Sequence, residues 1–380
     1  MKKNNLVRIS TLLMALFLIF TIVPAMGAQS DENYDVSAKK ALEHADAHVA
    51  YFSAIGALEF EDWKDADIDP QPVEFYDIDG KKLHYLFSVY DSKQLIGRIE
   101  VNANKTLGYP VQAFEFDPRP FDQNKAMEKS IEIANDKYPS GEIQSTRMVV
   151  YSYPKFGAMS LVIDKATGNK HRVIVDAYSL ELIPDKEPTE NEPGIWSVYD
   201  SISEDKAGEN VAKWDSSSEV IELMQQPYTD AQKDLPRIGS KELDVPLYGQ
   251  EESYYCAPAT AQMIAKYYGV THTQDYIFGI MDGDTGGCTN SEQLTYYKAS
   301  NGLDKDGSYH DDTPDFNDVV SEINNERPLK SAVTGHARAC IGYQDYGIRY
   351  ISINDPWPVN SGSNRLEIWG NVVNHIFVKD

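Results

Sequence analysis

The chain has 380 residues, enough for two domains or more, and 42% of them are hydrophobic, enough for sizeable cores. Acidic residues outnumber basic ones by 59 to 35, which gives a formal net charge of -24. A surface this acidic repels nucleic acid and anionic membrane faces, so we expect no nucleic-acid partner.

The first residues have the pattern of an export signal. Lys2, Lys3 and Arg8 give the start a positive charge, and an apolar run follows at 12–23. Small residues then provide a cleavage site, which predicts a signal peptide over residues 1–28. The apolar run is shorter than the ~20 residues of a membrane span, and the alternative is an uncleaved N-terminal anchor. In either case we expect the bulk of the chain to be secreted or extracytoplasmic.

Residues 29–184 are predicted to form an α+β domain. Apolar residues recur at helical spacing over 36–54, and alternating strand patterns follow, with an Asp79-Gly80 hairpin turn between the first two. The order then recurs, because Asp122 is placed to cap a second helix that Pro139 stops. We expect two repeats of a helix plus an antiparallel meander, with strands at 73–78, 83–90, 95–101, 111–116, 147–151, 159–163, 172–175 and 180–183.

The second repeat contains the stretch Leu161-Val-Ile-Asp-Lys-Ala-Thr-Gly168, followed by a strand at 173–177 and by Leu180. This hairpin resembles the PepSY-type modules that occur as pro-segments or attached domains of exported peptidases. The resemblance implies that this N-terminal domain inhibits or chaperones a peptidase domain of the same chain. The alternative is a plain structural or binding domain.

A linker is expected at residues 185–240. Its first part, 185–193, is polar and contains two prolines, which is typical of a connector. Removal of a pro-segment would require a cut in this region.

The stretch from Gln250 to Ile264 places a cysteine at the start of a predicted helix. Pro258 suits the first helical turn, and Gly269 is placed to end the helix. A thiol at a helix N-terminus feels the positive end of the dipole, which lowers its pKa and favours the nucleophilic thiolate. Gln250 lies six positions before Cys256, so we predict that its amide and a backbone N–H hold an oxyanion.

A cysteine nucleophile needs a base and a group that orients the base, and candidates for both follow downstream. His336 comes directly after Gly335 in a strand pattern. Asp355 ends the next strand and shares strand parity with the two isoleucines before it, while Asn354 is the competing orienter. Residues 241–380 are therefore predicted to combine a helical half, which carries the cysteine, with an antiparallel sheet, which carries the histidine and the aspartate; its strands are expected at 330–333, 337–342, 349–353 and 372–378.

Four pieces of this region match a known pattern: Gln250 six positions before Cys256, the Cys-Ala-Pro-Ala helix start, Gly335-His336 followed by Gly342-Tyr343, and Asn354-Asp355-Pro356-Trp357. In the order Gln, Cys, His, Asp, they resemble the papain-like cysteine peptidases and, within them, the C39-like branch. The resemblance covers residues 241–380. It implies a two-part papain-like fold, a peptide or protein substrate and no cofactor. It also implies a role for each site residue: Cys256 as nucleophile, His336 as base and acid, Asp355 as orienter and Gln250 in the oxyanion hole. Papain itself uses Asn as orienter, which keeps Asn354 as the alternative, whereas the C39-like pattern is Asp-Pro.

Three cysteines are an odd number for an exported protein. If Cys256 is the reactive thiol, Cys288 and Cys340 either form a disulfide or remain as two buried free thiols. We expect no metal site, because the remaining histidines have no partners at zinc-ligand spacing. The acidic loops at 282–288 and 304–312 show only part of a calcium-ligand series, so ordinary turns are the preferred interpretation there.

Two other functions are compatible with the same residues. A Cys-His-Asp set also serves acyl transfer in transglutaminase-like folds and amide hydrolysis in amidases. The third hypothesis is a binding protein with a retired peptidase fold, and a thiol no more reactive than a free cysteine would favour it.

Overall fold

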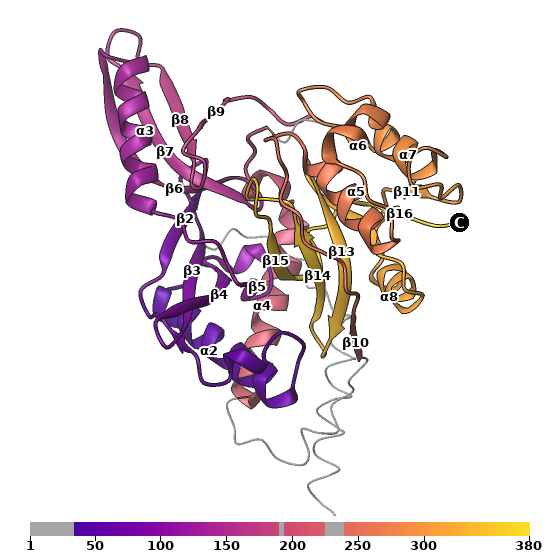
Figure 1. The fold of residues 1–380 in the computed structure, drawn as a ribbon. Helices are drawn as coiled ribbons and strands as arrows, with labels where there is room; N and C mark the ends of the chain where they lie inside the picture. The colour runs from indigo at the N-terminus through magenta and orange to yellow at the C-terminus, as the bar shows by residue number, and fades with distance from the viewer. Residues whose placement is uncertain (1–33, 190–193, 225–238) are drawn as a thin grey trace, which may run out of the picture. The chain divides into compact units, whose positions relative to one another are not determined.

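One sheet contains strands from both the N-terminal part of the chain, residues 34–224, and the C-terminal part, residues 239–380 (Figure 1). The computed structural model describes residues 34–189, 194–224 and 239–380, and the predicted signal peptide lies outside them. Within the described residues the sheet has 16 strands, and its only parallel pair is β2 (Val73–Asp77) with β6 (Gly141–Ser152). Helices and a large mixed sheet place the fold in the predicted α+β class. No helix in this part of the chain combines the length and the apolar character that crossing a membrane requires.

The N-terminal part begins with a helix that is capped at both ends. The side chain of Ser37 accepts a hydrogen bond from the backbone N–H of Lys40, which starts α2 (Ala38–Ile55). Gly56 ends the helix with a positive φ of 63°, a conformation that glycine adopts without strain. After the 3₁₀ helix η2 (Glu61–Trp63), the strands of this part are β1 (Asp67–Ile68), β2, β3 (Lys82–Asp91), β4 (Gln94–Asn102) and β5 (Val111–Phe116).

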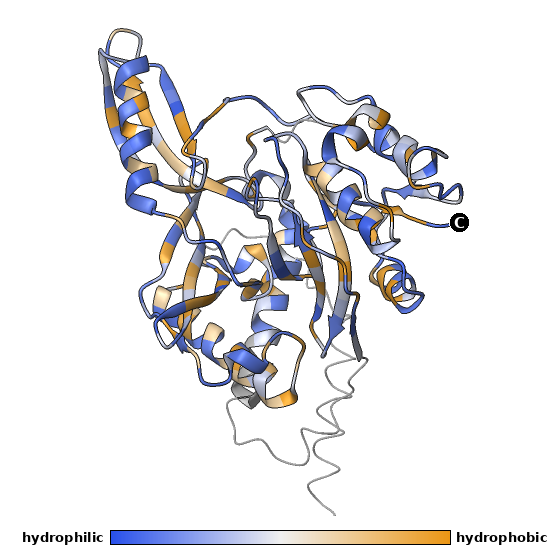
Figure 2. Ribbon diagram, in the orientation of Figure 1, coloured by the Kyte–Doolittle hydropathy of each residue, from blue (hydrophilic) through white to orange (hydrophobic). Residues whose placement is uncertain are grey.

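A second helix, α3 (Gln123–Lys137), lies along a long hairpin (Figure 1). The predicted cap is confirmed, since the Asp122 carboxylate accepts hydrogen bonds from the backbone N–H groups of Asn124 and Lys125. The outer face of α3 is hydrophilic (Figure 2), while Ser130 and Ala134 face the strands and are fully buried. The strands that follow are β6, β7 (Lys155–Asp164), β8 (Lys170–Asp176) and β9 (Leu182–Ile183).

The segment predicted as a linker contains a packed helix. α4 (Glu204–Met224) contacts α2 and the 3₁₀ helix η3 (Lys105–Leu107), and a shorter 3₁₀ helix, η4 (Tyr199–Ser201), precedes it. The Trp214 ring is buried in the N-terminal core, 5.1 Å from the ring of His44. The Asn210 side chain donates to the carbonyl of Thr106 at 2.8 Å. This part of 185–240 therefore belongs to the N-terminal structure, because a buried tryptophan fixes it there.

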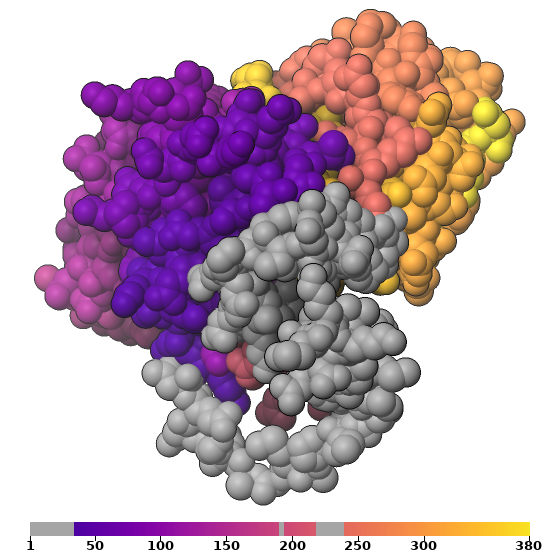
Figure 3. Space-filling view, turned by 90° about the horizontal axis from the view of Figure 1, so that it is seen from below, coloured from indigo at the N-terminus to yellow at the C-terminus, as the bar shows by residue number. Residues whose placement is uncertain are grey.

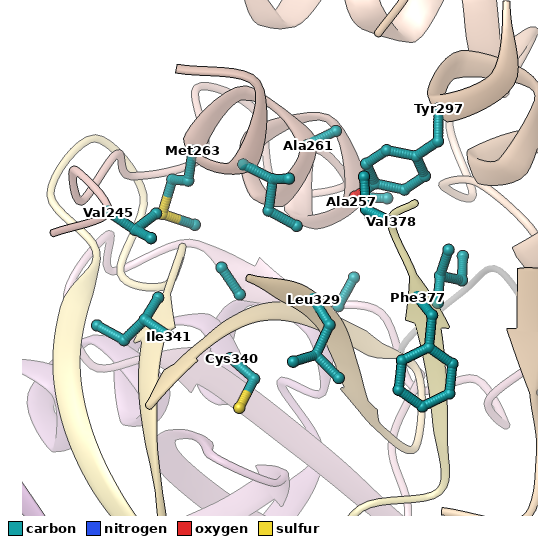
Figure 4. Packing of buried hydrophobic residues seen from close by; sticks show 14 of the residues in the cluster. Val245, Ala257, Ala261, Met263, Tyr297, Leu329, Cys340, Ile341, Phe377 and Val378 are labelled. Atoms are coloured by element: carbon teal, nitrogen blue, oxygen red, sulfur yellow. The ribbon is translucent and has the colours of Figure 1, made fainter. Parts of the chain in front are cut away.

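The C-terminal part places four helices against its strands. Figure 4 shows Ala257, Ala261 and Met263 of α5 (Cys256–Tyr267) above Leu329 and Ile341 of the sheet, where they form one hydrophobic core. The other helices are α6 (Gln274–Met281), α7 (Asn290–Lys298) and α8 (Phe316–Asn324). The strands are β10 (Gly239–Glu242), β11 (Tyr309–Asp311), β12 (Leu329–Val333), β13 (His336–Asp345), β14 (Arg349–Asp355), β15 (Ser363–Ile368) and β16 (Asn374–Phe377).

The strand that joins the two parts is β15, which the sequence patterns did not predict. It pairs antiparallel with β5, so that Leu366 lies opposite Phe114. Tyr350, Leu366 and Ile368 belong to the same hydrophobic cluster as Phe114 and the aromatic residues of the N-terminal part. Both parts contribute to the molecular surface seen from below (Figure 3).

A buried chain of charges crosses the same junction. Glu367 of β15 bonds to Arg338 of β13 and accepts from Arg365 Nε at 2.7 Å. Arg365 Nη2 also donates to Glu100 of β4 at 3.2 Å, and Glu100 lies 3.3 Å from His84 of β3. Removing one partner from such a set leaves an uncompensated buried charge, which is strongly destabilising. The two parts of the chain are therefore tied together by a shared core and by shared charges.

Candidate active site

Cys256 is the first residue of α5, as the sequence predicts, and its side chain is buried. Pro258 lies in the first turn of the helix, as predicted, where a missing N–H leaves no intrahelical bond unmade. Burial raises the pKa of the thiol, but the interaction with the His336 imidazole outweighs it and lowers the pKa of Cys256 to about 7. A thiol with this pKa is substantially ionised at neutral pH, which a nucleophile requires.

His336 is held by Asp355. The hairpin between β12 and β13 turns at Gly335, where φ is 67°, and places His336 as the first residue of β13. His336 Nε2 lies 2.7 Å from Asp355 Oδ1, and both side chains are 0% exposed. The same oxygen accepts the backbone N–H of Trp357 at 2.8 Å, which fixes the carboxylate. His336 Nδ1 has no hydrogen-bond partner in the described structure, so this nitrogen is left for the thiol.

Burial and charge oppose each other in the His336–Asp355 pair. Burial lowers the pKa of His336, but the Asp355 carboxylate outweighs it, and the net pKa is raised. Burial raises the pKa of Asp355, but the charges of His336 and Arg338 outweigh it, and the net pKa is lowered. Both pKa shifts favour a protonated His336 beside an ionised Asp355 in this buried site.

Asp355, and not Asn354, contacts the imidazole. Asn354 points to the other side of β14, where its Nδ2 donates to the carbonyl of Val245 at 2.8 Å. Its Oδ1 accepts from Asn364 at 3.1 Å. The alternation of side chains along a strand accounts for the difference between the two neighbours.

Gln250 is fully buried beside the segment that follows Asp355. Its backbone N–H donates to the carbonyl of Pro356, and its own carbonyl accepts from the N–H of Asn360, each at 2.8 Å. Its side-chain Nε2 donates to the carbonyl of Glu252 at 2.8 Å, and Oε1 has no partner among the described residues. Gln250 is thus anchored next to the histidine–aspartate pair.

All three cysteines are free and buried, so the disulfide between Cys288 and Cys340 is not formed in this structure. Burial raises the pKa of Cys340 to about 12. Burial, together with the neighbouring charge of Cys256, raises the pKa of Cys288 still further. Among the three thiols, only that of Cys256 has a lowered pKa.

The N-terminal part contributes residues to this site that the sequence analysis missed. The Trp357 ring packs edge-on against Phe156 and Tyr178, with centroids 4.9 Å apart in each case, and its Nε1 donates to Asp176 at 3.3 Å. The sequence does hold a signal for this contact, because Tyr153 lies in the turn between β6 and β7 and Phe156 follows it closely. Turns are dominated by Gly, Pro, Asn, Asp and Ser, so two large aromatic residues at this turn indicate that it packs against other residues.

Comparisons with known proteins relate the C-terminal part to one family. A family model described as the Peptidase_C39 like family matches residues 242–374. Among solved structures, the chain is similar to the peptidase domain of Streptococcus ComA, a bi-functional ABC transporter involved in a quorum-sensing pathway. That similarity has 18% identity and a TM-score of 0.28, and it covers 35% of this chain and 98% of that chain. No curated protein matches the chain. The family match includes Cys256, His336 and Asp355.

Proposed function

We propose that this protein is an exported cysteine peptidase that hydrolyses peptide bonds with Cys256, His336 and Asp355. The observation that carries the proposal is a thiol with a pKa of about 7 that interacts with an imidazole, itself held 2.7 Å from a buried carboxylate. The family match over residues 242–374 and the papain-like, C39-like order of the site residues support the same reaction class.

In the proposed reaction, His336 takes the proton of Cys256, and the thiolate attacks the carbonyl carbon of the scissile peptide bond. As the S–C bond forms, the carbonyl electron pair moves to the oxygen. His336 then gives its proton to the leaving amine while the C–N bond breaks, and a thioester remains. His336 next takes a proton from water, whose oxygen attacks the thioester carbonyl, and the C–S bond breaks to release the carboxylic acid and return Cys256 as thiolate. Asp355 holds Nε2 as the bonded nitrogen throughout, so that Nδ1 exchanges the proton.

The oxyanion formed in this reaction needs hydrogen-bond donors. Gln250 is the proposed side-chain donor, since its backbone is tied to Pro356 beside Asp355 and its buried amide has one of its two N–H groups bonded to Glu252. The first N–H groups of α5 have no partner within the helix and are the proposed backbone donors. Donors fixed in advance cost no reorganisation when charge develops.

The N-terminal part is proposed to act as an intramolecular inhibitor, in keeping with its PepSY-like hairpin. Cys256, His336 and Asp355 are all buried in the described structure, and Trp357 beside them is covered by Phe156 and Tyr178. An extended peptide has to reach the sulfur directly, so the contact between Trp357 and the hairpin has to loosen first. The charged, polar start and the apolar run of residues 1–28 support export of the chain.

The test is cleavage of an unfolded protein mixture, with new termini identified by mass spectrometry. We expect slow cleavage by the wild type, faster cleavage by Phe156→Ala, in which the cover is loosened, and none by Cys256→Ala in either background. Cys340→Ala is the matched control, because it removes a buried thiol of the sheet away from His336. Ammonia release without peptide cleavage would indicate an amidase, and amine incorporation without peptide cleavage would indicate an acyltransferase. Equal cleavage by Cys256→Ala and wild type would refute the proposal.

A further inference from the structure

The tip of the β6–β7 hairpin is buried, although hairpin tips normally lie at the surface. Ser152 is 0% exposed, Tyr153 and Lys155 are 4% exposed, and Phe156 is 7% exposed. Burial of the whole tip means that it is docked against another part of the protein.

The surface on which the tip docks is the catalytic end of the C-terminal part. Phe156 packs on Trp357, whose backbone N–H is bonded to Asp355. Tyr153 Oη accepts from Arg365 Nη2 of β15 at 3.4 Å, and the Arg365 guanidinium lies 6.0 Å from the Tyr153 ring centroid. Lys155 lies between these two anchors along the chain and is itself buried in the docked tip.

Lys155 is a buried lysine whose charge is not neutralised by an ion pair. Among the described residues, no carboxylate lies within salt-bridge distance of its ammonium, and no side chain bonds to it. Removing most of a lysine side chain from water is costly unless a negative charge lies near its ammonium, so an anion is expected close to Lys155. By contrast, Lys330, which is also buried, donates to Asn290 and Asn374.

The groups that lie around Lys155 are those of the catalytic site. Burial raises the pKa of Cys256 and His336 lowers it, and the next charge that lowers it is the ammonium of Lys155. Burial lowers the pKa of His336 and Asp355 raises it, and Lys155 again acts to lower it. Cys288, from the loop before α7, also faces Cys256, but its own raised pKa keeps it neutral. Arg338 and Arg365 act on the far side, through Asp355.

We propose that Lys155 is a positioning residue of the active site, whose ammonium stabilises the negative charge on the sulfur of Cys256. In the covered state the N-terminal part then also supplies one of the charges that keep the thiol of Cys256 ionised until the cover loosens. This inference rests on the proposed function, in which the Cys256 thiolate is the nucleophile. It differs from a purely structural role in one respect: removing the charge raises the pKa of the Cys256 thiol and also the pKa of the His336 imidazole.

The experiment is the pH dependence of Cys256 alkylation in the full chain, with the label quantified at that residue by mass spectrometry. Lys155→Met removes the charge and keeps most of the apolar stem, and Lys155→Arg keeps the charge. Lys165→Met is the matched control, because Lys165 lies at the other end of β7 with its side chain 64% exposed. The wild-type midpoint is expected near 7. We expect Lys155→Met to raise it by about half a pH unit or more, and Lys155→Arg and Lys165→Met to leave it unchanged. An unchanged midpoint in Lys155→Met would overturn the proposal.

A second variant covers the case in which Lys155→Met does not fold. Lys155→Gln removes the charge and keeps a polar group at the end of the side chain. It is expected to raise the midpoint of Cys256 alkylation in the same way, and an unchanged midpoint would reject the proposal. This readout needs no substrate. A shift of the thiol in a chain without peptidase activity would therefore support the role of Lys155 while refuting the proposed peptidase.

Discussion

Because the two parts share a hydrophobic core at the β5–β15 junction, we predict that a core substitution in the N-terminal part also destabilises the C-terminal part. Phe114 of β5 is fully buried, pairs across the junction with Leu366, and has ring contacts with Phe60 at 4.9 Å and Tyr350 at 6.3 Å. Replacement by alanine removes a ring from a closed core, and such changes cost ~3–5 kcal/mol. We expect Phe114→Ala to lower the free energy of unfolding by about this amount in both parts of the chain.

The assay follows a probe that lies only in the C-terminal part. Cys340 on β13 is 0% exposed, so its labelling at increasing urea concentration reports the unfolding of that part. Phe114→Ala is expected to move the midpoint of Cys340 labelling to lower urea. Leu182→Ala, at a position 39% exposed, is the control and is expected to change the free energy by less than ~0.5 kcal/mol. If Cys340 becomes labelled at the wild-type urea concentration in Phe114→Ala, the two parts unfold independently and the reasoning fails.

Three further predictions concern the site. Asp355→Asn removes the charge that raises the pKa of His336, so we expect kcat/KM to fall by a factor on the order of 10²–10⁴ with an unchanged circular dichroism spectrum, and a loss under tenfold would contradict the assigned role. Phe156→Ala removes the ring that lies 4.9 Å from that of Trp357, so Cys256 should be alkylated several-fold faster at fixed pH than in the wild type; an equal rate would argue against the cover. The His336–Asp355 pair should also make the free energy of unfolding depend on pH in an acidic and in a near-neutral window. The pKa of Asp355 is lowered by folding, so its contribution to stability is present above ~3.9 and is lost as pH falls through the pKa of the folded state. The pKa of His336 is raised by folding, so its contribution is present below ~6.5 and is lost as pH rises through the pKa of the folded state. Asp355→Asn should therefore flatten the unfolding free energy against pH in both windows in urea titrations, and curves parallel to the wild type would show that the pair does not contribute.

The sequence by itself determined the local features of this protein. Helical spacing and the Asp122 cap predicted α3, Pro258 predicted where α5 begins, and Gly269 predicted where it ends. The order of Gln250, Cys256, His336 and Asp355 identified the candidate site. Cys256, His336 and Asp355 each stand at one end of an element with a clear pattern, and Gln250 lies six positions before Cys256. These features depend on nearest neighbours along the chain, which a sequence displays directly.

The tertiary structure alone decided how the two parts of the chain meet. Strand β15 alternates charged and apolar residues only over the four positions 365–368, too few to identify a strand. Its charged residues Arg365 and Glu367 are buried against Arg338 and Glu100, and a buried charge has the same letter as an exposed one. The docking of Lys155 near Cys256 depends on a hairpin from a distant part of the sequence, and the free state of Cys288 and Cys340 depends on where the fold places each sulfur. Contacts between distant segments are set by which surfaces can be buried together, and the spacing of residues along a single chain does not record that choice.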